Sequence, residues 1–255
     1  MTDIKKNVSV FEADVVENYG YRYTTGAPFS SLAANRRITE ATLRLIPPGC
    51  GSILDAGCGD GTYVNDIRHA RPGLEMVGLD PAAEAINIAK ARYTGISFLE
   101  GNILRPATLP DKRFDLVILR GVLHHLSDPA AAIRNCAALA DRLLIIEPNG
   151  NNPILKIIER ASRYHREHEE QSFTPRRLRR WCGKAGLELE SLEFIGFVPF
   201  FFPEFPAKII YFLQPFLEKI PLLGRFFGAQ TVILCRRSAP SVKTADRVQA
   251  GTKEI

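Results

Sequence analysis

The stretch Ile53-Leu-Asp-Ala-Gly-Cys-Gly-Asp-Gly61 decides how the rest of this chain of 255 residues is interpreted. An apolar run ends at its start, glycines follow at every second position from Gly57, and residues 62–70 then have the character of a helix. In α/β proteins a strand that leads through a glycine loop into a helix brings backbone N–H groups close to a bound ligand. Glycine permits this because it tolerates positive φ and has no Cβ to block the approach. For a single glycine loop, a tight turn without a ligand is the alternative.

The composition limits the class of protein. A chain of this length can bury a substantial core, and its net charge of +5 is too modest to indicate a nucleic-acid partner. The five cysteines are odd in number, scattered and without CxxC spacing, which favours a reducing compartment and argues against disulfides and against a metal site. We find neither a signal peptide nor an apolar run long enough to span a membrane, and we therefore expect a cytoplasmic protein.

Strand-like and helical runs alternate regularly from residue 51 to residue 146. This alternation predicts a parallel sheet with helices on both faces, and right-handed crossovers restrict its topology. We therefore predict a doubly wound α/β fold. The predicted strands are 51–56, 74–79, 96–99, 114–119 and 142–146, and the predicted helices are 30–46, 62–70, one that begins at Pro81, and 129–140.

Polar residues stand where these predicted strands end, which is where open α/β sheets bind their ligands. Asp80 ends the second strand, 23 residues after Gly57, close to the separation expected for an acid that reaches a ribose hydroxyl. Asn102, Arg120 and Glu147 end or follow the next three strands. A glycine loop with an acid in this place is less easily explained by chance than the loop alone.

At this point the sequence resembles the class I S-adenosylmethionine-dependent methyltransferases, in particular the small-molecule group that includes quinone and lipid methyltransferases. The resemblance implies a Rossmann-like sheet of seven strands with the last strand antiparallel, S-adenosyl-L-methionine as cofactor and S-adenosyl-L-homocysteine as product. It covers residues 50–150 through the glycine stretch, Gly78-Leu-Asp-Pro81, Gly101-Asn-Ile103, Phe114-Asp-Leu-Val-Ile118, Leu123-His-His-Leu126 and Leu144-Ile-Ile-Glu-Pro148.

The resemblance also implies which residues bind the cofactor. Asp80 would accept the ribose hydroxyls, and Asn102 stands where the family usually has an Asp that reaches the adenine amino group. An Asn oxygen can accept the same bond but adds no charge. A nicotinamide-dependent dehydrogenase is the rival interpretation, but its pattern would place a third glycine where the chain has Thr62. The full predicted set is Asp55, Gly57, Gly59 and Gly61 around the methionine part, with Asp80, Pro81, Asn102, Ile103 and Arg120.

Histidines are the candidate catalytic residues. Methyl transfer needs a base only if the attacking group must lose a proton, as a hydroxyl does. His124 and His125 follow the fourth strand, and we predict His125 as a base or acceptor-orienting group, with structural packing as the alternative. We assign His165 and His168 to the acceptor site, although a solvated charged helix face explains them as well. The sequence offers no convincing metal ligands.

Beyond Gly150 the chain has a different character. Ten of its fifteen phenylalanines fall between Phe194 and Phe227, in or beside a proline-rich segment, 199–228. The further predicted helices are 153–164 and 175–185, the second capped by Thr174, and the further strands are 187–197 and 230–236. We predict a helical cap (1–48), a Rossmann-like methyltransferase domain (49–237) with a hydrophobic insertion between its last two strands, and a disordered tail (238–255).

The Phe-rich segment suggests the acceptor. It has three interpretations, namely a lid over an apolar acceptor, a homodimer interface or a peripheral membrane patch. Arg176, Arg177, Arg179 and Arg180 suit anionic headgroups. We predict methyl transfer to an oxygen of an apolar, lipid-like or aromatic small molecule, at or near the inner face of a membrane.

Two other functions stay open at this point. The chain can be a cofactor-binding, membrane-associated partner protein without turnover of its own. RNA methylation has only the arginine cluster in its favour, because no RNA-binding module is present and Arg120-Gly-Val-Leu123 stands where a base-methylating motif would be. We therefore expect no nucleic-acid partner.

Overall fold

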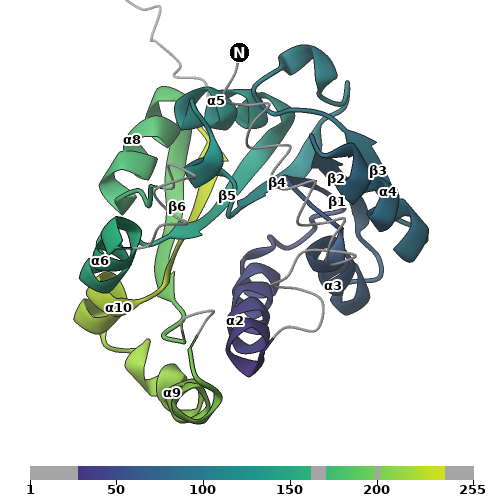
Figure 1. Cartoon of the computed structure of the whole chain (residues 1–255). Coiled ribbons are helices and arrows are strands. Elements are labelled where there is room, and N and C mark those ends of the chain that lie inside the picture. The colour runs from purple at the N-terminus through teal and green to yellow at the C-terminus, as the bar shows by residue number, and fades with distance from the viewer. Residues whose placement is uncertain (1–27, 162–170, 199–201, 239–255) are drawn as a thin grey trace, which may run out of the picture.

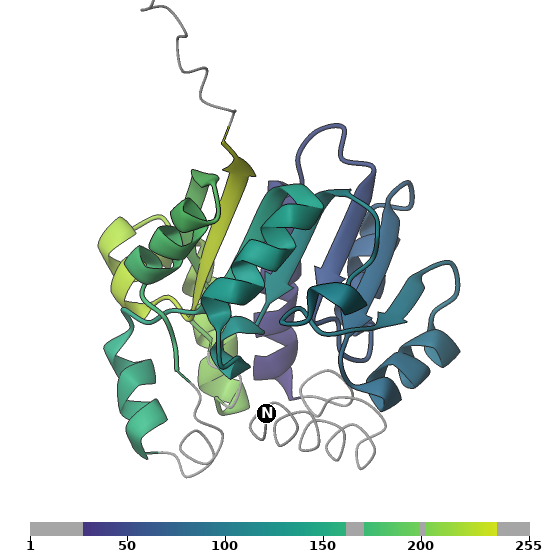
Figure 2. The same cartoon turned by 90° about the horizontal axis from the view of Figure 1, so that it is seen from above.

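A computed structural model describes residues 28–161, 171–198 and 202–238, and these form a single seven-stranded sheet covered by helices on both faces (Figures 1 and 2). The strand order is β3-β2-β1-β4-β5-β7-β6, and β7 runs antiparallel to both of its neighbours. The predicted doubly wound fold and its antiparallel last strand are confirmed. The strands are β1 Ser52–Ala56, β2 Glu75–Asp80, β3 Ser97–Glu100, β4 Phe114–Arg120, β5 Ala140–Pro148, β6 Leu187–Ile195 and β7 Gln230–Arg237.

Two hydrophobic clusters, one on each face of the sheet, form the core. Successive residues of the buried strands point to opposite faces, so that Ile118 of β4 joins the cluster under one layer and Leu119 joins the other. The first cluster packs against α2 (Phe29–Leu45), α3 (Thr62–Ala70) and α4 (Ala83–Arg92), and the second against α5 (Pro129–Leu139) and α8 (Pro175–Lys184). Two short 3-10 turns, η1 (Pro106–Thr108) and η2 (Leu123–His125), lie in the loops around β4.

The predicted bounds that fall on described residues all lie within two residues of the observed ones, and one of these differences has a clear local reason. The helix after β2 begins at Ala83 rather than Pro81. The reason is local, because the Asp80 carboxylate accepts a hydrogen bond from the Ala82 N–H and Ala82 stays extended. The predicted cap of α8 is confirmed, since the Thr174 hydroxyl accepts from the Arg177 N–H. Residues 1–27, 162–170 and 239–255, which include much of the predicted cap and tail, lie outside the described residues.

The Phe-rich insertion contains two helices, α9 (Glu204–Leu217) and α10 (Pro221–Phe227), between β6 and β7. Helix α9 packs against α2, where Arg37 forms a bidentate ion pair with Glu218 just past its end. Tyr211 also meets Phe29 edge to face, with 5.8 Å between ring centroids. The insertion is therefore fastened to the N-terminal helix. A last helix, α6 (Pro153–Ala161), lies beside α10 (Figure 1).

In the parts of the chain that the structure describes, no helix combines the length and the apolar character that crossing a bilayer would require.

Candidate functional site

The glycine loop joins β1 to α3 in a conformation that demands glycine. Gly57, Gly59 and Gly61 have φ of +99°, +54° and +77°. A Cβ on Gly57 would lie 2.3 Å from a methyl carbon of Val122, and one on Gly61 would lie 2.8 Å from the Phe98 ring. The loop therefore lies directly against the segment that follows β4, at the carboxyl edge of the sheet, and four of its five residues are buried.

Asp80 ties this loop to the start of α4. One carboxylate oxygen accepts from the Gly59 N–H and the other from the Ala82 N–H, both at 2.9 Å. Burial raises the pKa of Asp80 to about 6, and the two N–H donors oppose that rise. Each oxygen retains a second lone pair, so the carboxylate can hold the loop and still accept a ligand hydroxyl.

Asp55 is buried, and its Oδ1 atom has no hydrogen-bond partner among the described residues. Burial raises its pKa to about 7; the positive charge of Arg120 opposes the rise and the charge of Asp80 adds to it. A buried carboxylate oxygen without a donor is costly, and such groups in native proteins usually await a ligand, water or ion. Asp55 therefore fits a ligand that carries an N–H donor or a positive charge.

Arg120 extends the site toward the N-terminal helix. Its guanidinium carbon lies 4.4 Å from the centroid of the Tyr63 ring, and it donates a hydrogen bond to the side-chain oxygen of Asn35 on α2. These three residues line a cavity of about 310 Å³ between α2 and α3, together with Leu32, Arg36, Thr39, Glu40, Thr62 and Asp66. The predicted residue Arg120 is thus brought to the same edge as Asp55, and α2 forms one wall of the space beside it.

The remaining predicted cofactor residues lie around the loop after β3 and at the end of β2. The Asn102 side-chain oxygen accepts from the Leu104 N–H at 2.8 Å, so this side chain already shapes its own turn. Ile103 is buried in the core, and its carbonyl accepts from the Asn135 side chain. Pro81 is half-buried beside Asp80. Sequence reasoning did not foresee these internal bonds.

A histidine and a buried glutamate form a pair at the ends of β4 and β5. The His124 Nδ1 atom lies 2.8 Å from Glu147 Oε2, and Glu147 is fully buried. The other carboxylate oxygen accepts from the Val122 and Leu123 N–H groups, each at 2.8 Å. A carboxylate on Nδ1 holds the proton there and leaves the lone pair on Nε2, which is the arrangement of a general base.

The predicted His125 is the neighbour of this pair. Its ring centroid lies 3.9 Å from that of His124, at an interplanar angle of 43°. Both residues were noticed in the sequence, but the partnership of His124 with Glu147 was missed. Adjacent parallel strands end at one edge, and this could have linked the histidine after β4 to the acid that ends β5. His165 and His168 lie outside the described residues.

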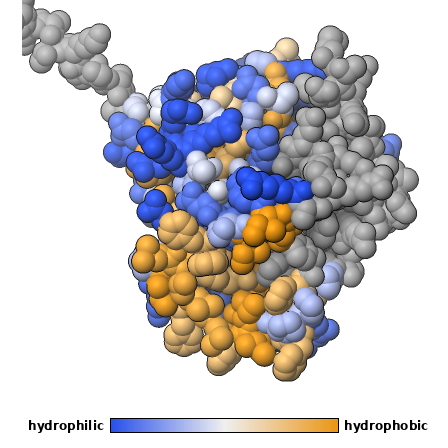
Figure 3. Space-filling view, turned by 60° about the vertical axis from the view of Figure 1, so that its left-hand side comes forward, coloured by the Kyte–Doolittle hydropathy of each residue, from blue (hydrophilic) through white to orange (hydrophobic). Residues whose placement is uncertain are grey.

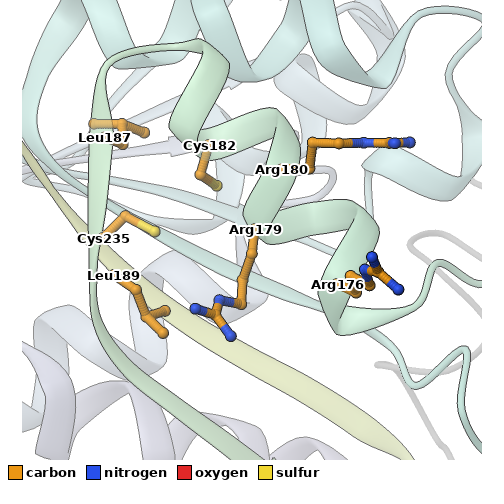
Figure 4. Close-up of a pocket in the computed structure, with 7 residues that line it drawn as sticks. All are labelled: Arg176, Arg179, Arg180, Cys182, Leu187, Leu189 and Cys235. Carbon is orange, nitrogen blue, oxygen red and sulfur yellow. The ribbon is translucent and has the colours of Figure 1, made fainter.

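A second pocket, of about 440 Å³, lies at the opposite edge of the sheet, beside the start of β6 and the end of β7 (Figure 4). The Cys182 and Cys235 thiols form a hydrogen bond in its floor, which raises the pKa of Cys182 and lowers that of Cys235. It is separated from the glycine loop by the length of the strands and does not belong to the candidate site. Its other lining residues are Arg176, Arg179, Arg180, Leu187 and Leu189.

Comparison with known proteins shows the family to which the chain is similar. The family described as "Methyltransferase domain" matches residues 31–192. The ubiquinone biosynthesis O-methyltransferase of Alkalilimnicola ehrlichii is 27% identical over 172 residues, which are 58% of this chain and 64% of that protein. The protein of the same name from Neisseria meningitidis is 28% identical over 162 residues, or 55% and 65% of the two chains. The chain thus spans just under two thirds of the length of these relatives.

Among solved structures, the magnesium protoporphyrin IX methyltransferase of Synechocystis PCC 6803 with bound SAH has a similar fold, with a TM-score of 0.64 and 17% identity. The likeness covers 92% of this chain and all of that one. The plantazolicin methyltransferase BpumL, also solved with SAH, gives a TM-score of 0.56 at 15% identity, over 93% of this chain and 92% of that one. At these identities the likeness concerns the fold.

Proposed function

The chain belongs to the methyltransferase domain family, and from this premise we propose that it transfers the methyl group of S-adenosylmethionine to an oxygen atom of an apolar, lipid-like or aromatic small molecule. The observation that carries the proposal is the buried Asp55 oxygen without a donor, under a loop of three positive-φ glycines. Together they form a cradle for a ligand that brings its own positive charge.

The proposed cofactor site uses residues from four strand ends. The loop glycines admit the methionine part of the cofactor, Asp55 receives its ammonium group, and Asp80 accepts the ribose hydroxyls. Asn102, with Pro81 and Ile103, borders the adenine, and Arg120 closes the site toward α2. The cofactor supplies the activated methyl group when bound, so the protein contributes binding, orientation and exclusion of water.

The residue proposed to take the proton from the acceptor is His124. A hydroxyl acceptor must lose its proton as its oxygen attacks the methyl group, and Nε2 of His124 is the atom that would receive it. Glu147 fixes the ring and stabilises the imidazolium that results. His125, the base predicted from the sequence, would instead orient the acceptor. His165 and His168 remain candidates for the acceptor site.

The apolar character of the acceptor is inferred from the chain's own insertion. Helix α9 packs on α2, and α2 in turn lines the cavity beside Arg120, so one helix connects the insertion to this space. The relatives named as ubiquinone biosynthesis O-methyltransferases support an oxygen as the methylated atom. We place the reaction at a membrane surface that residues 199–228 contact from the inner face.

The cofactor assignment is tested by calorimetric titration with S-adenosylhomocysteine. The purified chain should bind it in the micromolar range, and Asp80→Ala should lose that binding, because the ribose acceptor and the tie to the glycine loop are both removed. Asp111→Ala, an exposed acid away from the site, is the matched control and should bind as the wild type does. A wild-type protein that binds no S-adenosylhomocysteine, or an Asp80→Ala variant that binds it unchanged, would contradict the proposal.

A further inference from the structure

We propose that the helices α6, α8, α9 and α10 form one docking face for a membrane that contains anionic lipid. This inference deepens the proposed function, on whose membrane contact it rests, by extending that contact beyond residues 199–228 and by stating the charge of the lipid. We call this surface the docking face. Its apolar part is Ile154, Ile157, Phe205, Ile209, Phe212, Leu213, Phe216, Ile220, Leu222, Phe226 and Phe227, and its basic part is Arg176, Arg177, Arg179, Arg180 and Arg225.

The apolar part of the docking face concentrates exposed hydrophobic side chains to a degree that ordinary protein surfaces lack. Among the described residues, eleven of the fourteen large hydrophobic side chains that are strongly exposed belong to it. Phe205 and Phe212 are 77% and 75% exposed. Figure 3 shows a continuous apolar area on this side of the molecule, bordered by a hydrophilic area. Side chains of this size in water need a partner to cover them.

The fold holds helix α9 with its apolar side facing solvent. The aromatic residues at 205, 212 and 216 recur at helical spacing and face solvent, whereas the inward side carries the buried residues Ala207 and Gln214. Gln214 is held there because its side-chain oxygen accepts from the Phe197 N–H at 2.9 Å. A rotation of the helix that buried its phenylalanines would break this bond and the Arg37–Glu218 ion pair. The outward apolar side is therefore fixed by the fold.

Two buried asparagines hold the helices of the docking face together. Asn149 donates to the carbonyls of Arg225 and Gly228, and Asn152, at the start of α6, donates to those of Phe227 and Gly228. The backbone next to Asn149 pairs with Phe173, two residues before α8. The starts of α6 and α8 and the end of α10 thus meet at one rigid joint, so that their surfaces act as one body.

The positive charges of the docking face favour a negatively charged membrane as its partner. Helix α8 carries five cations and no carboxylate, and none of its four arginines forms an ion pair among the described residues. Arg225 and Lys219 lie over the phenyl rings of Phe226 and Phe216, at 5.6 and 5.9 Å from the ring centroids. Aromatic side chains next to cations suit the interface between acyl chains and negative headgroups. A second copy of the chain is a less suitable partner. In a two-fold dimer with α8 near the axis, the arginines of the two α8 helices would face each other and repel.

The position of the insertion, which carries most of the apolar part of the docking face, agrees with this partner. The chain leaves β6 at Ile195 and returns at Gln230, which pairs with Pro148 at the carboxyl end of β5. The insertion therefore lies at the same edge of the sheet as the glycine loop. An acceptor dissolved in the bilayer can meet the cofactor edge without crossing open water.

The test is sedimentation with vesicles. We expect the full chain to bind phosphatidylcholine vesicles that contain about one third phosphatidylglycerol, and to bind less as NaCl rises from about 0.1 to about 0.5 M. Phe212→Ser/Phe216→Ser and Arg176→Glu/Arg179→Glu should each lower the partition coefficient by about tenfold or more. Leu99→Ser and Lys90→Glu, exposed residues away from the docking face, are the matched controls and should change nothing.

Three results would overturn the inference. These are no vesicle binding by the wild type, equal binding to vesicles of pure phosphatidylcholine, and a dimer in light scattering that the phenylalanine variant dissociates. Titration of every variant with S-adenosylhomocysteine separates this failure from failure of the proposed function, because the substituted side chains lie outside the cofactor site. A variant that binds S-adenosylhomocysteine normally is folded, and its loss of vesicle binding then concerns the docking face alone.

Discussion

Asp55 and Asp80 lie within one buried acidic cluster, in which the charge of Asp80 raises the pKa of Asp55 and the charge of Asp60 raises that of Asp80. Burial raises the pKa of Asp55 to about 7 and that of Asp80 to about 6, so both carboxyls resist ionisation in the free protein. A cationic ligand reverses this preference. The same burial that destabilises the ionised free protein therefore favours a positively charged partner, which links cofactor affinity to pH.

The first prediction concerns the stability of the cofactor-free protein. Because the folded pKa of Asp55 lies above its unfolded value, its stabilising contribution is complete below the unfolded value near 4 and is lost as pH rises to about 7. Asp55→Asn should therefore unfold at higher denaturant than the wild type at pH 8, and the gap should close on acidification toward pH 4. Urea unfolding between these pH values measures it. A gap that is constant with pH would contradict the raised pKa.

The same substitution should act in the opposite direction on the ligand. Asp55→Asn removes the charge that receives the ammonium group, and we expect S-adenosylhomocysteine to bind about ten- to a hundredfold more weakly at pH 8. Wild-type affinity should also fall as pH drops below about 7, since the carboxyl must then lose its proton on binding. Calorimetry across this pH range, with the variant as reference, gives both results. Equal affinities of the two proteins at pH 8 would contradict the assignment of Asp55 to the cofactor site.

The histidine pair gives a prediction about catalysis. His124→Gln should lower kcat with an alkylated catechol as acceptor by about 10²–10⁴-fold, while His125→Gln should act mainly on KM. Glu147→Gln keeps the two backbone hydrogen bonds, but its amide NH2 would donate to Nδ1 and put the ring proton on Nε2, so it should lower kcat about as much as His124→Gln does. Rates from transfer of a labelled methyl group check this. Similar losses of kcat in both histidine variants would argue against a single base.

At the scale of elements, the Arg37–Glu218 ion pair fastens α9 to α2. The two side chains are 20% and 9% exposed, and Glu218 also accepts from the Gly196 N–H, so one carboxylate links α2, α9 and the end of β6. Glu218→Gln should lower the free energy of unfolding by about 1–3 kcal/mol. It should also speed hydrogen exchange in residues 204–217 without changing residues 62–70. Glu204→Gln, which breaks only an exposed pair with Lys208, should leave both unchanged.

The sequence predicts the strands well and the insertion poorly, for physical reasons. Apolar runs bounded by Gly, Pro or Asp determine strands, and the glycine loop and Asp80 are close in the chain as well as in space. The prolines of the insertion look like interruptions, but Pro203 stands directly before α9 and Pro221 is the first residue of α10. The outward apolar side of α9 also contradicts the usual rule of burial. The His124–Glu147 pair depends on strand order, which local pattern does not contain.

At the scale of the whole molecule, the cofactor edge and the insertion with α9 and α10 share one end of the sheet, whereas Arg179 and Arg180 of α8 line the pocket toward the other end. The glycine loop follows β1, and the insertion joins β6 to β7 at the same edge, with α9 resting on the helix that lines the cavity beside Arg120. This arrangement separates two tasks. The central strands hold the cofactor, and the added helices determine where the protein finds its acceptor.

This separation predicts how turnover depends on the membrane. With a long-chain alkyl catechol incorporated into anionic vesicles, Phe212→Ser/Phe216→Ser should lower the rate by about tenfold, because less enzyme reaches the bilayer. With a short, water-soluble catechol and no vesicles, the variant and the wild type should turn over at equal rates, since neither side chain belongs to the cofactor site. Transfer of a labelled methyl group measures both. An equal loss with the soluble catechol would show that the insertion acts as a wall of the acceptor site rather than as a membrane contact.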